Sequence, residues 1–65
     1  MASYRLYCLD GAGRISLADW IEADSDEDAI VKAGAIKNGA QKCEIWQLNR
    51  LVATINGGHV EPARP

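Results

Sequence analysis

Apolar and polar residues alternate along the first third of the chain. The stretches YRLYCLD and RISLADWIEA are rich in β-forming residues, and they flank Asp10-Gly-Ala-Gly13, which is typical turn chemistry. This pattern predicts a β-hairpin with a three-residue loop at residues 11–13. Gly13 is expected to take the left-handed conformation that such a loop needs.

This loop length predicts a register for the hairpin. From the turn outward, the expected opposite pairs are Leu9 with Ile15, Arg5 with Asp19 and Tyr4 with Trp20. Residues that are directly opposite in an antiparallel pair share one face of the sheet. One face of the hairpin is therefore expected to collect Tyr4, Leu6 and Trp20.

A helix is predicted from Ser25 to about Asn38. Small and branched apolar residues recur there with helical spacing. They are Ala29, Ile30, Ala33, Ile36 and Ala40. Asn38-Gly39 is typical of a helix end. Val31 and Ala35 lie on the opposite side of this helix and are interpreted as ordinary surface residues.

The carboxylates clustered at residues 24–28 either begin this helix or bind a cation. Asp24 is expected to cap the first free amides, with Glu27 reaching back to complete a capping box. The D-x-D-x-D spacing also opens a calcium loop. However, the later positions that need Gly and Glu in such a loop hold Ala29 and Ala35. We therefore predict a helix start and no metal site.

A second hairpin is predicted in the stretch KCEIWQLNRLVATI. Its two apolar runs flank Leu48-Asn49, and a two-residue loop there places Trp46 opposite Leu51. Leu48 is poorly suited to the positive φ that such a turn demands, so a longer loop is an alternative. Residues 56–65 are rich in Gly and Pro and are predicted to form a flexible C-terminal tail.

The order of these elements predicts one ββαββ domain over residues 1–55. It would be an α+β fold of two layers, with one helix on a four-stranded, mostly antiparallel sheet. The pattern leaves open the strand order and which face of the second hairpin meets the helix. A chain of 65 residues buries only about 60% of its unfolded surface, so its stability is expected to be marginal.

One helix covers only one face of a sheet, and the other face is normally polar. Here the face expected to hold Tyr4, Leu6 and Trp20 is apolar and aromatic, which soluble monomers rarely leave in water. The simplest cover is a second copy of the chain, so we predict a homodimer with these three residues near the contact. The alternative is that the tail or the twist of the strands covers them in a monomer.

Composition and charge exclude several classes of function. The chain has seven Lys and Arg against nine Asp and Glu, so it has little attraction for nucleic acid. It has neither a signal-peptide pattern nor an apolar stretch long enough to span a bilayer, so we predict no membrane contact and a cytoplasmic location. Cys8 and Cys43 lie in apolar, alternating segments and are predicted to be free, core-facing thiols in a reducing compartment.

Signatures of catalysis are sparse. The only histidine, His59, lies in the predicted tail, and the set Cys8, Cys43 and His59 lacks metal-ligand spacing. We therefore predict no cofactor, no metal and no enzymatic activity. The favoured function is a protein-interaction module that self-associates through its sheet, or offers the sheet to a larger protein. The alternative is a small-ligand binder or accessory enzyme subunit with a pocket between sheet and helix.

The segments YRLYCLDGAGRI, DWIEADSDEDAI and CEIWQLNRLVATI together resemble a group of short, uncharacterised bacterial proteins. The resemblance covers residues 4–55. It implies a bacterial, cytoplasmic setting and the same ββαββ pattern, and it carries no activity, cofactor or functional residue. This chain departs from the group at Gly34, where an arginine is expected, and at Leu48, where a smaller turn-forming residue is expected.

Overall fold

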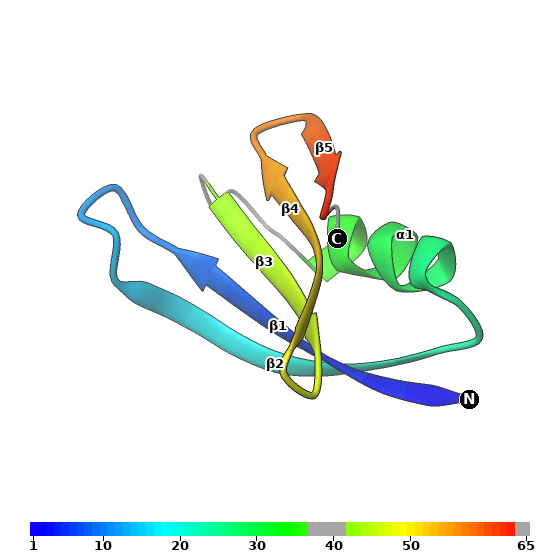
Figure 1. The fold of residues 1–65 in the computed structure, drawn as a ribbon. Helices are drawn as coiled ribbons and strands as arrows, with labels where there is room; N and C mark the ends of the chain where they lie inside the picture. The colour runs from blue at the N-terminus through cyan, green and yellow to red at the C-terminus, as the bar shows by residue number, and fades with distance from the viewer. Residues whose placement is uncertain (37–41, 64–65) are drawn as a thin grey trace.

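The computed structural model describes residues 1–36 and 42–63 of the chain. Its elements are β1 (Ala2–Leu9), β2 (Ile15–Ala23), α1 (Asp26–Ile36), β3 (Lys42–Gln47), β4 (Arg50–Asn56) and β5 (His59–Pro62). The strands form one antiparallel sheet in the order β2-β1-β3-β4-β5 (Figure 1). The predicted α+β class with one helix is confirmed in the described residues, but the sheet there has five strands and not four.

The extra strand, β5, comes from the segment that was expected to be a flexible tail. It pairs with β4, with Asn56 opposite His59 and Ala53 opposite Pro62. The two strands are joined through Gly57, whose φ of 63° suits a tight turn. The prediction of a flexible tail is therefore wrong for residues 59–62, because its glycines form a hairpin turn.

The turn between β1 and β2 has the predicted form. Gly13 has a φ of 81°, and Leu9 lies opposite Ile15. The Asp10 N–H donates to the Arg14 carbonyl at 2.8 Å, and the Asp10 carboxylate accepts from the Arg14 N–H at 3.0 Å. The aspartate side chain therefore closes the loop locally, as expected for this residue type in turns.

One residue beyond this turn, a bulge at Ser16 changes the register. Leu9 pairs with Ile15 but Cys8 pairs with Leu17, so Ser16 has no partner in β1, and its hydroxyl donates to the Cys8 carbonyl at 3.2 Å. Further along, the pairs are Arg5 with Trp20 and Tyr4 with Ile21. A slip of one residue moves every later side chain to the other face. The predicted pairings of Tyr4 with Trp20 and of Arg5 with Asp19 are therefore wrong.

The β3–β4 turn confirms the two-residue loop. Gln47 pairs with Arg50 and Trp46 with Leu51, and Leu48 takes a positive φ of 55° despite its side chain. A second register shift follows between Ile45 and Trp46.

The helix begins at Asp26, and its cap lies one residue later than the predicted cap, Asp24. The Asp28 N–H donates to the Ser25 hydroxyl at 3.1 Å, and the Ala29 N–H donates to the Ser25 carbonyl at 3.0 Å. The Asp28 carboxylate in turn accepts from the Asp24 N–H at 3.2 Å. The acidic run thus begins a helix as predicted, but the cap is Ser25 in place of Asp24, and the side chain that reaches back is Asp28 in place of Glu27.

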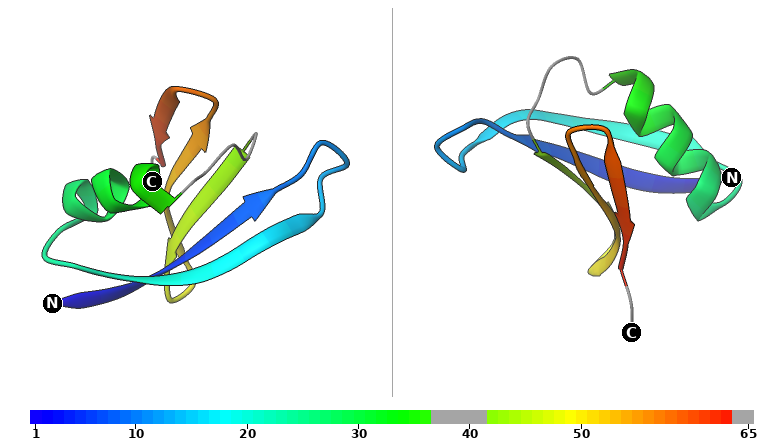
Figure 2. Two further views of the ribbon diagram at one scale, coloured as in Figure 1. Left: turned by 180° about the vertical axis from the view of Figure 1, so that it is seen from behind. Right: turned by 90° about the horizontal axis from the view of Figure 1, so that it is seen from above.

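The core lies between α1 and one face of the sheet. It consists of Tyr4, Leu6, Cys8, Ile21, Ala23, Ala29, Ala33, Cys43, Ile45, Val52, Ala53 and Ile55. The alanine stripe of the helix faces this core as predicted, while Val31 and Ala35 are exposed. The predicted Ala40 contact and the Asn38-Gly39 helix end lie outside the described residues. Figure 2 shows α1 on one side of the sheet, with the β1–β2 turn extending away from it.

A disulfide joins the two cysteines inside this core. Cys8 and Cys43 are direct partners across β1 and β3, with their Cα atoms 4.0 Å apart, and both are fully buried. The prediction of two free thiols is wrong, although both residues do face the core. The bond connects the N-terminal hairpin to the three C-terminal strands. The prediction of a reducing compartment had free thiols as one of its reasons, and that reason no longer applies.

Candidate interaction surface on the open face of the sheet

The face of the sheet opposite α1, here called the open face, carries aromatic side chains. Trp20, Arg5 and Trp46 are opposite one another on β2, β1 and β3, so they form one row across three adjacent strands. Trp20 is 60% exposed. Tyr7 lies on the same face, two residues along β1 from Arg5.

Aromatic contacts hold Arg5 in place at the centre of this row. Its guanidinium carbon lies 4.5 Å from the centre of the Trp20 ring, which is a cation–π contact. Its Nη1 donates to the Tyr7 hydroxyl at 2.9 Å. A guanidinium has five N–H donors, and stacking occupies its face and leaves its edge available. Arg5 is therefore positioned to donate hydrogen bonds to an anionic or carbonyl group of a partner.

A shallow hollow of about 290 Å³ adjoins the row. Its lining combines rings, one cation and one exposed aliphatic side chain, namely Ser3, Arg5, Tyr7, Trp20, Trp46 and Leu48. At its border the Trp46 Nε1 donates to the Glu44 carboxylate at 3.2 Å. The open face thus offers tryptophan, tyrosine and arginine, the residue types enriched at protein contact sites, with one carboxylate beside them.

The three residues expected to form the interaction surface do not lie together. Tyr4 and Leu6 are buried beneath α1, and Trp20 lies on the opposite face of the sheet. The predicted grouping is therefore wrong for Tyr4 and Leu6, because the bulge at Ser16 exchanges the two faces of β2. The involvement of Trp20 in a contact stays a prediction.

The sequence interpretation missed Arg5, Tyr7 and Trp46 as partners of Trp20. A signal was present in β1, where Ser3, Arg5 and Tyr7 alternate with Tyr4 and Leu6. The more polar of these two sets indicates the solvent side of the sheet.

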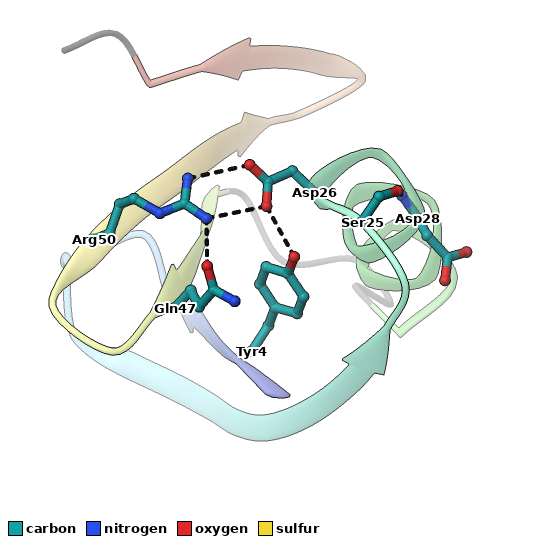
Figure 3. Close-up of polar contacts among 6 residues, drawn as sticks. All are labelled: Tyr4, Ser25, Asp26, Asp28, Gln47 and Arg50. Carbon is teal, nitrogen blue, oxygen red and sulfur yellow. Dashed lines mark hydrogen bonds and ion pairs between the residues drawn. The ribbon is translucent and has the colours of Figure 1, made fainter. Parts of the chain in front are cut away.

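A second polar cluster joins the start of α1 to the sheet. The Asp26 carboxylate accepts from the Tyr4 hydroxyl at 2.8 Å and from both terminal nitrogens of Arg50 at 3.1 Å (Figure 3). Arg50 also donates to the Gln47 side chain. Because these residues come from β1, α1 and the β3–β4 hairpin, the cluster fixes the helix on the sheet.

The electrostatics of this cluster favour a structural role. Hydrogen bonds from Arg50 and Tyr4 hold the pKa of Asp26 below its ordinary value. Burial raises the pKa of Tyr4, and its hydrogen bond to Asp26 raises it further. The tyrosine is therefore kept protonated as a donor, and the aspartate is kept charged as an acceptor. Neither group is shifted toward the neutral range that general acid–base catalysis needs.

The other titratable side chains considered from the sequence, His59 and the carboxylates at the start of α1, form isolated contacts on the surface. His59 lies on β5, where its Nε2 is 3.9 Å from the Glu61 carboxylate. The Asp28 carboxylate pairs with Lys32 at 3.3 Å, and its pKa is lowered by the hydrogen bond from the Asp24 N–H and by Lys32. In residues 1–36 and 42–63, no group of three His, Cys, Asp or Glu side chains is arranged to hold a metal ion.

No protein-family model, curated protein or solved structure matches this chain. Across the part of the chain that the structure describes, no helix has the length and apolar character required to cross a bilayer.

Proposed function

We propose that this protein is a small, non-enzymatic interaction module that self-associates through the open face of its sheet. The observation that carries this proposal is the exposure of Trp20 on the face that α1 does not cover, in one row with Arg5 and Trp46. Tryptophan, tyrosine and arginine are the residues enriched where protein contacts are strongest. Each aromatic side chain also removes a large apolar area from water when a partner covers it.

β2 is one edge strand of the sheet, and its outward-pointing backbone groups decide whether a partner can add a strand there. The Cα atoms of Cys8 and Cys43 have the short spacing of a non-hydrogen-bonded pair, so the Cys8 backbone is directed toward β2. Leu17, the partner of Cys8, is then hydrogen-bonded to β1. By alternation, Trp20 and Glu22 direct their N–H and C=O groups away from the sheet.

Side chains already occupy part of this outer edge. The Trp20 N–H donates to the Asp19 carboxylate at 2.8 Å, and the Glu22 carbonyl accepts from the Lys32 ammonium at 2.7 Å. The other edge strand, β5, has four residues and ends at Pro62, which has no N–H to donate. Both features protect edges against strand addition, so the open face is the better surface for a partner.

The size of the molecule sets how much of the face a dimer must use. A stable interface buries about 800 Å² on each partner. The chain measures 32 × 23 × 21 Å, so most of one broad face must contribute. Because polar residues share that face, we expect a dimer that dissociates in the micromolar range.

Light scattering over a micromolar concentration series tests the proposal. Wild-type protein should approach twice the 7.0 kDa mass of one chain. Trp20→Glu should remain a monomer with unchanged circular dichroism, because it replaces the most exposed ring of the open face with a charge that the contact would bury. Val31→Glu is the matched control, since Val31 is 72% exposed on the helix and away from the open face. A single-chain mass for wild type at every concentration would contradict the proposal.

A small-ligand binder is the second candidate. The hollow of about 290 Å³ on the open face favours it, because this volume is close to the lower end for ligand sites, about 300 Å³. This candidate predicts a monomer at all concentrations, with Trp20 fluorescence that changes when a compound binds.

A further inference from the structure

We propose that two copies pack with their open faces together about a twofold axis over the β1–β3 seam, so that Arg5 of each copy pairs with Glu44 of the other. This inference rests on the proposed self-association and specifies its geometry. It makes Arg5 and Glu44 the pair that selects the partner and its orientation.

Arg5 and Glu44 are close neighbours that do not pair within one chain. Arg5 is opposite Trp46, and Glu44 is opposite Tyr7, so the two charged residues are diagonal on the open face. Arg5 turns toward Trp20 and the Tyr7 hydroxyl, while Glu44 accepts from the Trp46 indole. Among the ion pairs of residues 1–36 and 42–63, none includes either of them.

A twofold axis parallel to the strands would bring these charges together between copies. With the axis over the seam, β1 of one copy lies over β3 of the other. Arg5 then lies over Trp46 of the second copy, across the spacing of about 10 Å between packed sheets, and Glu44 of that copy is about 7 Å further along the same strand. The backbones of Arg5 and Glu44 are then about 12 Å apart, a separation that the two long side chains span together. The symmetry makes the contact twice, as an isologous interface requires.

This position of the axis also matches the distribution of apolar surface. It places Arg5, Trp46 and Tyr7 near the axis, and Trp20, one strand further out on β2, lies over β4 of the second copy. The β5 residues His59 and Glu61, which are exposed and charged or polar, are left at the rim. An apolar centre with a polar rim is the usual arrangement of a protein interface.

Charge reversal with mixing tests the inference. Arg5→Glu places two carboxylates opposite each other in a homodimer, and Glu44→Arg places two cations there. Each variant alone should dimerise at least about tenfold more weakly than wild type. An equimolar mixture of the two restores both opposite-charge pairs, so it should form a heterodimer. Native mass spectrometry distinguishes this heterodimer by its mass, and circular dichroism checks that both variants fold.

Arg14→Glu is the matched control. Arg14 is exposed at the β1–β2 turn, so reversing its charge should leave the dimer intact, and mixing it with Glu44→Arg should restore nothing. Glu44→Gln keeps an acceptor for the Trp46 indole while removing the charge. It should weaken the dimer less than Glu44→Arg does.

The possible outcomes separate this inference from the proposed function. If wild type dimerises and Trp20→Glu does not, but the charge-reversed mixture stays monomeric, self-association holds and the Arg5–Glu44 geometry is overturned. Single variants that dimerise like wild type overturn it equally. A monomeric wild type overturns both proposals.

Discussion

The two faces of the sheet bury or expose apolar groups in different ways. The face beneath α1 uses compact side chains such as Leu6, Ile45 and Cys8, which are fully excluded from water. The open face uses Trp20 and Trp46, with Arg5 between them. Aliphatic packing serves stability within one chain. Aromatic rings beside charged groups tolerate water and can also be covered by a partner. Changes on the covered face should therefore alter stability, and changes on the open face should alter assembly.

The largest expected effect on the covered face comes from breaking the Cys8–Cys43 disulfide. The cysteines are 35 positions apart, and a crosslink of that length stabilises a fold by about 4 kcal/mol in the chain-entropy model. Reduction, or the double change Cys8→Ala and Cys43→Ala, should lower the unfolding free energy by about this amount. Urea unfolding with and without reductant measures it.

The same experiment checks the contrast between faces. Where reduced protein still folds, its dimer mass should match that of the oxidised protein, because neither cysteine reaches the open face. An unfolding midpoint that is unchanged by reductant would show that the disulfide contributes nothing.

A smaller effect is expected at the border of the covered face, where Asp26 links Tyr4 and Arg50. Asp26→Asn should cost about 1 kcal/mol, because the charged hydrogen bonds are weakened in a partly exposed site. Asp24→Asn removes a carboxylate from the same segment without breaking this cluster and serves as the control.

The pH dependence of this effect has a definite sign. Because the pKa of Asp26 is lowered in the folded state, its stabilisation is complete above the unfolded value of about 3.9 and is lost as the pH falls through the folded value. Acid unfolding of Asp26→Asn should therefore be less steep in that range than that of wild type. Parallel acid-unfolding curves for the two proteins would contradict this assignment.

The smallest change is expected at Leu48, beside the hollow of the open face. Leu48 is 93% exposed and has a positive φ, which costs a residue with a Cβ about 1 kcal/mol. Leu48→Gly should raise the unfolding free energy by about 0.5 kcal/mol, because the larger backbone entropy that glycine loses on folding offsets part of the relieved strain. Asn49→Gly in the same turn should give no such gain, since Asn49 is not in the positive-φ region. Thermal unfolding compares the two variants, and equal shifts would exclude relief of backbone strain.

Several local features could be predicted from the sequence because their causes are local. Gly13 adopts the left-handed conformation expected after Asp10, since a three-residue hairpin loop needs it. The acidic segment begins the helix, and the buried stripe of Ala29 and Ala33 follows from a 3.6-residue repeat. The two-residue loop at Leu48 follows from the spacing of the flanking apolar runs.

Other features were decided by partners that are distant in the chain. The bulge at Ser16 is a property of the pairing between β1 and β2, and it moved Trp20 from the face of Tyr4 to the face of Arg5. The same applies to β5, which is a strand only because β4 supplies its hydrogen-bond partners. Neither the bulge nor the added strand has a strong signature in its own residues.

The sequence by itself therefore determined the first four strands, the helix, their order and the α+β class, because turn chemistry and hydrophobic period act over a few residues. Only the tertiary structure decided which side chains share a face and that Cys8 lies against Cys43. The physical reason is that side chains alternate with a period of two along a strand, so a single unpaired residue reverses the face of all that follow.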